Sequence, residues 1–139
     1  MTRDAIHTAG APAAIGPYSQ GIAAPEGRFV FLSGQIALDP ATGLLIEGDA
    51  EAQTHRVMRN LQAVLQAAGG DLGDLVRTTI FLRDLEDFPR VNQAYATWLQ
   101  PPYPARATVE VRRLPRDVAV EIDGIAVVPP AGHRPGTPP

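Results

Sequence analysis

Residues 49–68 read DAEAQTHRVMRNLQAVLQAA, and this stretch predicts the longest helix of the chain. Its apolar positions recur at steps of three and four residues, the spacing of a helix that buries one face. That stripe comprises Thr54, Val57, Met58, Leu61, Val64, Leu65 and Ala68. Gly69 and Gly70 follow directly and are expected to end the helix. An apolar helix face of this length requires a sheet or another helix to cover it.

Outward from this helix, segments rich in β-branched and apolar residues predict strands. They are residues 28–33, 44–46, 75–83, 106–112 and 119–128, the second of them returning from a tight turn at 39–43. A second helix is expected after an N-cap at Asp87. Its inward stripe is Val91, Tyr95, Trp98 and Leu99, before Pro101 and Pro102 end it. Strands that bracket two helices predict an α+β fold, a mixed β-sheet with both helices on one face.

The strands at 28–33 and 119–128 carry apolar side chains in both alternating positions, so both of their faces are expected to be buried. Two helices cover only one face of such a sheet. We therefore expect the uncovered face to pack against other copies of the chain in a homo-oligomer.

The chain has 139 residues, which suits one domain. We place that domain at residues 1–128 and expect the Pro- and Gly-rich residues 129–139 to form a disordered tail. No apolar run approaches the roughly 20 residues of a membrane span, and residues 1–5 do not resemble the start of a signal peptide. A soluble, cytoplasmic protein is expected.

Two residue types are missing, and their absence excludes several chemistries. The chain has no cysteine, and all 12 of its basic residues besides histidine are arginines. Disulfides, thiolate metal sites and a lysine Schiff base are therefore impossible. The histidines His7, His55 and His133 are far apart in sequence, so no metal site is expected. The net charge of −3 makes nucleic-acid binding unlikely, and no cofactor motif is present.

Arg106 is the first candidate for chemistry. Period-two geometry places Arg106, Thr108 and Glu110 on one face of their strand, with Ala107, Val109 and Val111 packing on the other. A guanidinium at the start of a strand can bind a carboxylate through two parallel hydrogen bonds. A surface ion pair is the alternative for the same residue.

Glu121 is the second candidate, because it is a carboxylate within an otherwise apolar strand. Such a group is paired, solvated by a cleft or functional, and a salt bridge to a neighbouring arginine remains open. Tyr18 and Ser33 are either site residues or ordinary core and turn residues. Ser33 lacks the local pattern of a serine nucleophile.

Several segments, in order from about residue 12 to residue 128, together resemble the RidA (YjgF) family of reactive intermediate deaminases. They are AIGPYSQ at 14–20, SGQI at 33–36, DPATG at 39–43, TTIFL at 78–82, DF at 87–88, VN at 91–92, PAR at 104–106 and VEI at 120–122. The resemblance implies a chorismate-mutase-like α+β fold and a homotrimer with clefts between subunits. It also implies the cofactor-free hydrolysis of 2-iminobutanoate or 2-iminopropanoate to the 2-keto acid and ammonia.

The resemblance implies roles for individual residues as well. Arg106 matches the arginine that binds the substrate carboxylate, and Glu121 matches the acidic residue associated with the attacking water. Tyr18, Ser33 and Gly34 fall where the family lines its cleft, and Asn92 matches a recurrent residue to which we give a structural role. Thr108 stands where some members have cysteine, so its hydroxyl is expected to help orient water.

Two other functions remain open. Relatives are also associated with RNA cleavage and inhibition of translation, for which Arg112, Arg113 and Arg116 form the one candidate basic patch. A non-catalytic trimer that binds ligands or acts as a chaperone is the third interpretation. The sequence does not indicate which imine is preferred, which pathway supplies it, or what the tail does.

Overall fold

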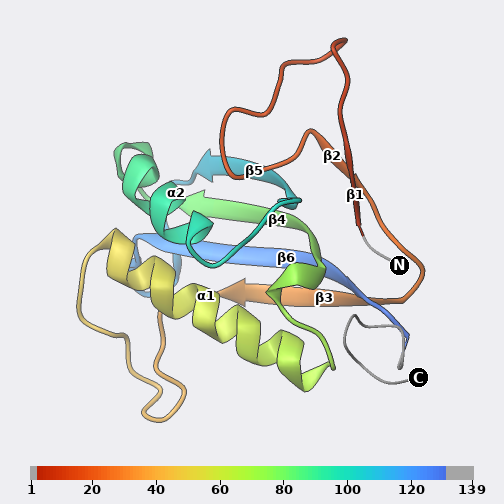
Figure 1. The fold of residues 1–139 in the computed structure, drawn as a ribbon. Helices are drawn as coiled ribbons and strands as arrows, with labels where there is room; N and C mark the ends of the chain where they lie inside the picture. Colours follow the sequence, from red (N-terminus) through yellow and green to blue (C-terminus); the bar gives the residue numbers. More distant parts are fainter. Residues whose placement is uncertain (1–2, 131–139) are drawn as a thin grey trace.

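The computed structural model describes residues 3–130, and a mixed four-stranded sheet forms the centre of this part (Figure 1). The strands lie in the order β3 (Arg28–Gln35), β6 (Val120–Val128), β4 (Leu75–Leu82) and β5 (Ala105–Glu110). β6 is antiparallel to both of its neighbours, whereas β4 and β5 are parallel. Parallel neighbours need a crossover connection, which helix α2 (Phe88–Ala96) supplies.

Helix α1 (Ala50–Ala67) matches the helix predicted from the sequence. It begins at Asp49, whose side chain accepts a hydrogen bond from the backbone N–H of Ala52. It ends where Gly69 adopts a positive φ of 85°, a conformation that glycine enters without steric cost. Val64 alone departs from the predicted buried stripe within the helix, since 41% of it is exposed.

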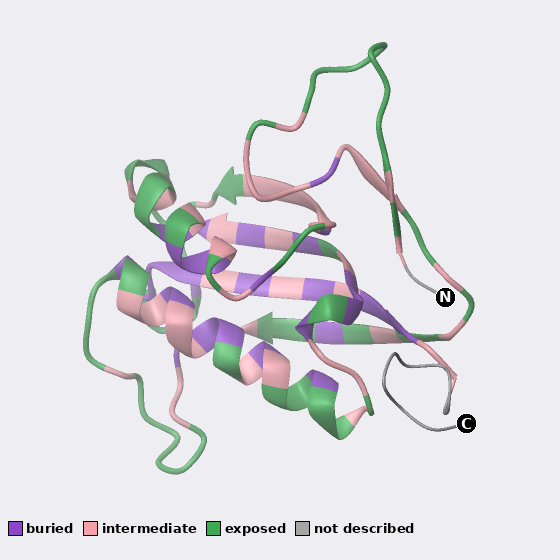
Figure 2. Cartoon of the chain, viewed as in Figure 1, coloured by how far each residue is buried: buried purple, intermediate pink, exposed green. Residues whose placement is uncertain are grey.

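Both helices cover the same face of the sheet, which confirms the predicted α+β architecture (Figures 1 and 2). The central strand β6 alternates strictly along its first half, and its helix-facing side chains are buried. The core joins these side chains to the inward stripe of α1. Its largest members include Val57, Met58, Leu61, Leu65, Ile80, Leu82, Tyr95, Val120 and Ile122.

Within residues 3–130, no helix covers the other face of the sheet (Figure 1). The expectation that residues 28–33 form a strand buried on both faces is wrong for the single chain, because the helices cover only one face of β3. Its Phe29 and Phe31 are 65% and 74% exposed, and Val109 of β5 is also exposed on this side. We call Phe29, Phe31 and Val109 the open-face patch. The apolar pattern that predicted burial therefore marks a surface that this chain leaves uncovered.

The predicted hairpin around residue 43 forms only in part. The turn exists, because the N–H of Gly43 donates to the carbonyl of Asp39 and the N–H of Asp39 donates to that of Leu44. The predicted strand at 44–46 does not form, and an isolated bridge between Leu38 and Leu45 takes its place. Leu44 and Leu45 are exposed, so in this chain their side chains gain little burial from strand pairing.

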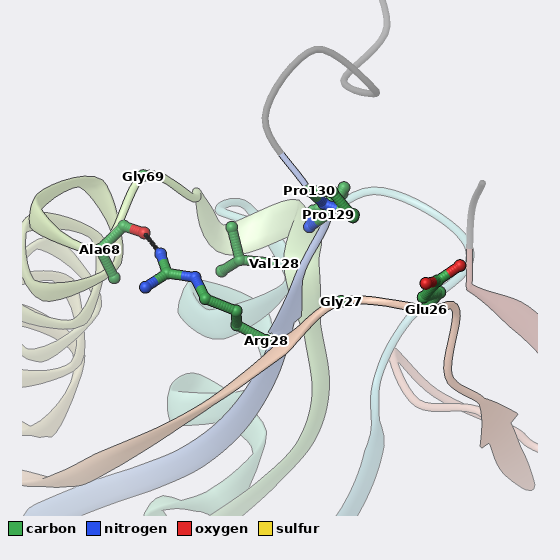
Figure 3. Close-up of a pocket in the computed structure, with 8 residues that line it drawn as sticks. All are labelled: Glu26, Gly27, Arg28, Ala68, Gly69, Val128, Pro129 and Pro130. Atoms are coloured by element: carbon green, nitrogen blue, oxygen red, sulfur yellow. Dashed lines mark hydrogen bonds between the residues drawn. The ribbon is translucent and has the colours of Figure 1, made fainter.

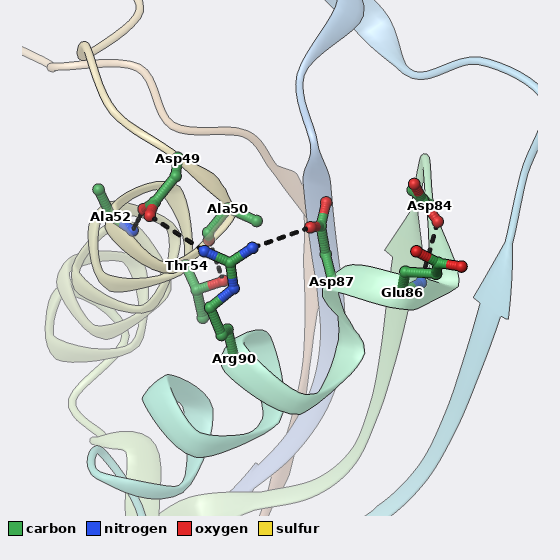
Figure 4. A network of polar contacts seen from close by, with 8 residues as sticks. All are labelled: Asp49, Ala50, Ala52, Thr54, Asp84, Glu86, Asp87 and Arg90. Carbon is green, nitrogen blue, oxygen red and sulfur yellow. Dashed lines mark hydrogen bonds and ion pairs between the residues drawn. The ribbon is translucent and has the colours of Figure 1, made fainter.

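The start and the end of α2 also differ from the prediction. Asp87 occupies the N-cap position, but its side chain makes no capping hydrogen bond and lies near Arg90 instead (Figure 4). The helix ends at Ala96, so Trp98 and Leu99 lie beyond it. The chain there continues in tighter i to i+3 turns, and the Trp98 indole N–H donates to Nδ1 of His55.

The shorter elements connect this framework. A two-stranded sheet of β1 (Asp4–Ile6) and β2 (Gly21–Ala23) was not expected, because its strands are short and rich in small residues. The described part of the chain also contains three single-turn 3₁₀ helices: η1 (Leu72–Asp74), η2 (Leu85–Asp87) and η3 (Pro115–Asp117).

Beyond β6, the described chain continues to Pro129 and Pro130, which line a pocket with Arg28 near the end of α1 (Figure 3). The Arg28 guanidinium donates there to the carbonyl of Ala68. The predicted tail otherwise falls on residues 131–139, outside the described residues. Within residues 3–130, neither helix has the length and apolarity needed to cross a bilayer.

Candidate functional site

A pocket of about 450 Å³ opens at the β5 edge of the sheet, on the face that carries the helices. The N-terminal loop forms one wall, α2 another, and β5 the floor. Its lining residues are Ile15, Gly16, Tyr18, Phe88, Asn92, Arg106 and Thr108. Three residues predicted for the site, Tyr18, Arg106 and Thr108, therefore meet in one pocket.

The register of β5 against β4 explains why Arg106 and Thr108 face the helices. Arg106 lies opposite Thr78, and Thr108 lies opposite Ile80. Thr78 and Ile80 are both fully buried on the helix side, and the Thr78 hydroxyl is 2.7 Å from that of Tyr95 in α2. Since side chains alternate along a strand, Arg106 and Thr108 share this face.

Aromatic rings enclose the Arg106 guanidinium. Its central carbon lies 5.2 Å from the ring centre of Tyr18, 5.4 Å from that of Phe88 and 5.3 Å from that of Tyr95. These distances are within the range of cation–π attraction. Nη1 donates a 2.7 Å hydrogen bond to Oδ1 of Asn92. The rings and the amide together restrict the orientation of the guanidinium.

The charge of Arg106 is not balanced by a neighbouring acid. Among residues 3–130, Arg106 takes part in no ion pair. Burial lowers its pKa, while Tyr95 and Tyr18 act in the opposite direction, and an arginine in a protein stays protonated. A half-buried guanidinium with donors still available is suited to an anionic ligand, and its planar fork matches a carboxylate.

Thr108 adds a polar atom to the same pocket. Its Oγ1 is buried and has no hydrogen-bond partner within the part of the chain that the structure describes. A buried hydroxyl without a partner costs free energy unless water or a ligand satisfies it. Thr108 is therefore available to bind a molecule held by Arg106.

Glu121, Ser33 and Gly34 lie on the opposite face of the sheet. Glu121 pairs in register with Phe81, the residue after helix-facing Ile80, so its side chain points to the open face. Ser33 and Gly34 lie where the β3–β6 register shifts, between the pairs Leu32–Gly124 and Gln35–Ile122. Within one chain, these residues do not join the Arg106 pocket.

Gly34 and Glu121 are nevertheless in close contact with each other. A Cβ at position 34 would collide with Oε2 of Glu121, so the glycine allows the carboxylate to lie against the β3 backbone. Burial and, secondarily, the charge of Asp123 raise the pKa of Glu121. Because carboxylates with a perturbed pKa cluster at functional sites, Glu121 stays a candidate for proton transfer.

Sequence reasoning did not assign Phe88 and Tyr95 to the site, and it gave Asn92 only a structural role. These residues follow one another at steps of four and three along α2, so they project from one side of the helix. An aromatic–amide–aromatic stripe of this spacing is a signal that could have identified them. Ile15 and Gly16 carried no comparable signal, because they lie in an irregular loop.

Two other candidate features are less suited to binding. No group of three or more histidines and acidic residues within residues 3–130 is arranged to hold a metal ion. In the basic cluster, Arg113 pairs with Asp117, and Arg116 donates to the carbonyl of Gly43. Arg113 thus has a carboxylate partner within its own turn, and Arg116 contacts the separate turn at residues 39–43.

The sequence is similar to those of known proteins along most of its length. The model of a family described as endoribonuclease L-PSP matches residues 8–128. Protein DfrA of Myxococcus xanthus is 57% identical over 127 residues, covering 91% of this chain and 97% of that protein. A 2-iminobutanoate/2-iminopropanoate deaminase of Salmonella typhimurium is 48% identical over 125 residues, covering 88% and 95%.

A solved structure is similar as well. The crystal structure of E. coli TdcF with bound serine has a TM-score of 0.70 and 42% identity, and the match covers 90% of this chain and 98% of that chain. Together with further solved structures of the same kind, this match confirms the chorismate-mutase-like arrangement of two helices on a mixed sheet.

Proposed function

Because this chain belongs to the endoribonuclease L-PSP family, also called RidA or YjgF, we propose that it hydrolyses small 2-imino acids to 2-keto acids and ammonia. The observation that carries the proposal is the guanidinium of Arg106. It is half-buried among three rings, forms no ion pair within the described residues and lines a pocket. Such a group favours a small ligand with a carboxylate.

The names of two relatives support this substrate class. One is a 2-iminobutanoate/2-iminopropanoate deaminase, and another binds serine, a small amino acid. We propose the same two imines as substrates here. The side chains of Ile15 and Phe88 offer apolar surface for the short carbon chain of the substrate.

We propose that the complete site lies between subunits of a homotrimer. Arg106 and Glu121 are on opposite faces of the sheet, so they can act on one substrate only if different copies supply them. The open-face patch of Phe29, Phe31 and Val109 favours such contacts, because large apolar patches rarely stay exposed. A stable monomer near 14.8 kDa in light scattering would contradict this assembly.

In the proposed mechanism, Arg106 holds the substrate carboxylate and thereby orients the C=N group. Glu121 of the partner subunit accepts a proton from water as its oxygen attacks the imine carbon, and Thr108 Oγ1 helps to position the reacting groups. Glu121 returns this proton to the imine nitrogen, which gives a neutral tetrahedral carbinolamine. The hydroxyl proton of the carbinolamine then passes by way of Glu121 to the nitrogen, and the C–N bond breaks as the C=O bond forms, releasing ammonia. A raised pKa of Glu121 suits this role, since the same group must accept and return a proton near neutral pH.

The test is an imine-hydrolysis assay on the wild type and Arg106→Ala. The imine is generated freshly by an amino-acid oxidase, and the 2-keto acid is measured against the spontaneous rate. Arg106→Ala should fold and lose most of the enzymatic rate. Arg90→Ala, which removes an exposed arginine from helix α2 beside the pocket, should retain this rate. Equal turnover by wild type and Arg106→Ala would reject the assignment.

We also propose a cytoplasmic location, where enzymes that release such imines operate. RNA cleavage is the less favoured function, because a net charge of −3 gives the chain no general attraction for a phosphate backbone.

A further inference from the structure

The N-terminal loop, residues 7–20, forms one wall of the Arg106 pocket, yet most of its side chains are exposed and contribute little to the core. Residues 7–13 are all exposed, and they include no large apolar side chain. Ile15, nearer the pocket, is 92% exposed. Long irregular loops of this kind are held by local contacts when they are ordered and are often functional.

One side chain makes most of those contacts. Oε1 of Gln20 accepts a 2.7 Å hydrogen bond from the N–H of Thr8, and its Nε2 donates to three carbonyls. These carbonyls belong to Thr8 at 3.0 Å, Ala11 at 3.2 Å and Pro12 at 2.7 Å. The opposite amide orientation would set an oxygen against three carbonyl oxygens, so the contacts fix which way the amide points.

The Gln20 amide acts on Thr8 as the backbone of an adjacent strand would, because it binds both the N–H and the carbonyl of that residue. It thereby extends the β1–β2 pairing, which ends at Ile6 and Gly21, by one further step. The first half of the loop is closed by this side chain. The second half is held separately, by hydrogen bonds from Ser19 to the carbonyls of Tyr103 and Pro104.

Between these two anchors lie the pocket residues. The backbone N–H of Ile15 donates to the Tyr18 hydroxyl, and the Tyr18 ring covers Arg106. If the Gln20 contacts are lost, the nearest remaining N-terminal tether is the β1–β2 pair of Ile6 and Gly21, so a longer segment, residues 7–17, is left without these contacts. The Tyr18 ring and the pocket mouth then gain freedom that substrate binding must remove.

We infer that Gln20 is a positioning residue for carboxylate binding, acting through the loop that carries Ile15 and Tyr18. It touches neither the pocket nor the reacting atoms. This inference rests on the proposed function, and it assigns a role to a residue that lies outside the predicted site.

The test compares Gln20→Met, which keeps the side-chain length without its hydrogen bonds, with Gln20→Glu, which keeps the acceptor and loses the donors. Gln66→Met, at an exposed position of α1, is the matched control. We expect KM for the imine to rise about fivefold in both Gln20 variants, with kcat within about twofold of wild type, because ground-state and transition-state binding weaken together. The control should change neither constant.

Two further measurements separate failure of this inference from failure of the proposed function. Calorimetric titration with 2-ketobutanoate, the expected product, reports binding without turnover and should also weaken about fivefold. Hydrogen exchange of the amides of residues 8–15 should accelerate in the Gln20 variants. Wild type without turnover or product binding would overturn the proposed function and this inference with it. If the wild type is active but binds 2-ketobutanoate no more tightly than Gln20→Met does, the inference about Gln20 is overturned and the proposed function stands.

Discussion

Two arginines lie on opposite sides of helix α2, and they differ in their exposure to water and in their charged neighbours. Arg90 lies on its outer side, 61% exposed, with its guanidinium 3.7 Å from Asp49 and 3.9 Å from Asp87 (Figure 4). Arg106 lies against its inner side, half-buried, with three rings and one amide around it. Arg90 has two carboxylates and ample water, whereas Arg106 has neither an ion pair within the described chain nor full solvation.

This contrast indicates which arginine is available to a ligand. An exposed guanidinium with carboxylates nearby gains little from its ion pairs, because water screens them. A desolvated guanidinium without an acid interacts more strongly with a carboxylate that enters its pocket. Substitutions on the two sides of α2 should therefore have effects of very different size.

The largest effect should come from Arg106→Lys. An ammonium keeps the charge but cannot reproduce the planar fork or its packing between rings. We expect kcat/KM to fall about 1,000-fold, in line with losses of 2–5 kcal/mol when one partner of a buried charge pair is truncated. Steady-state imine hydrolysis measures this, with circular dichroism to verify folding. Retention of a tenth of the activity would show that the fork geometry is unimportant.

Glu121→Gln should lower kcat about 100-fold, because the amide cannot accept a proton from water. The pH dependence provides a second readout. Glu121 must be ionised to act as the base, and its pKa is raised from the ordinary value of 4.5. As the pH is lowered, wild-type activity should therefore begin to decline at a higher pH than an ordinary glutamate would give. The Gln variant should lack this acidic limb. An identical pH profile for both proteins would exclude Glu121 as the base.

Thr108→Val replaces the hydroxyl with a methyl group of similar shape. We expect a loss of about tenfold in kcat/KM, corresponding to one hydrogen bond near the reacting groups. The melting temperature should stay constant or rise slightly, because a buried Oγ1 without a partner is removed. A lower melting temperature with unchanged kinetics would instead indicate a purely structural hydroxyl.

The smallest effect should come from Arg90→Ala. Removing two long, exposed ion pairs should reduce the free energy of unfolding by less than about 1 kcal/mol. Thermal unfolding at low and high salt measures this, and the difference from wild type should shrink as salt rises. Imine hydrolysis should remain within about twofold of wild type. A large kinetic defect would mean that α2 must be held from both sides to position Arg106.

The sequence predicted well those features that depend on local periodicity. Helix α1 repeats its apolar residues over five turns and is capped by Asp49 and Gly69, so its position followed from the pattern. The sequence also predicted correctly that Arg106 and Thr108 share one face of their strand, because side chains alternate along β5. The exposure of Phe29 and Phe31 in the single chain did not follow from their strand alone, since an apolar strand pattern does not show which face the chain's own helices cover.

Residues that depend on contacts distant in sequence were harder to predict. The separation of Arg106 from Glu121 across the sheet follows from the register of three strands, which no single strand contains. The role of Gln20 depends on a loop that doubles back onto it, and such loops have no periodic signal. Asn92 and Tyr95 were placed on a helix, but their contact with Arg106 required the parallel pairing of β4 and β5.

The exposed phenylalanines of β3 have a consequence for how the protein is handled. If copies of the chain cover this surface, then folding stability and the number of complete sites both obey mass action. Specific activity should then decrease when the protein is diluted below the dissociation constant of its assembly, even though no residue has changed. Rates measured at nanomolar and micromolar protein would differ per chain, and excess subunits would restore the lost activity.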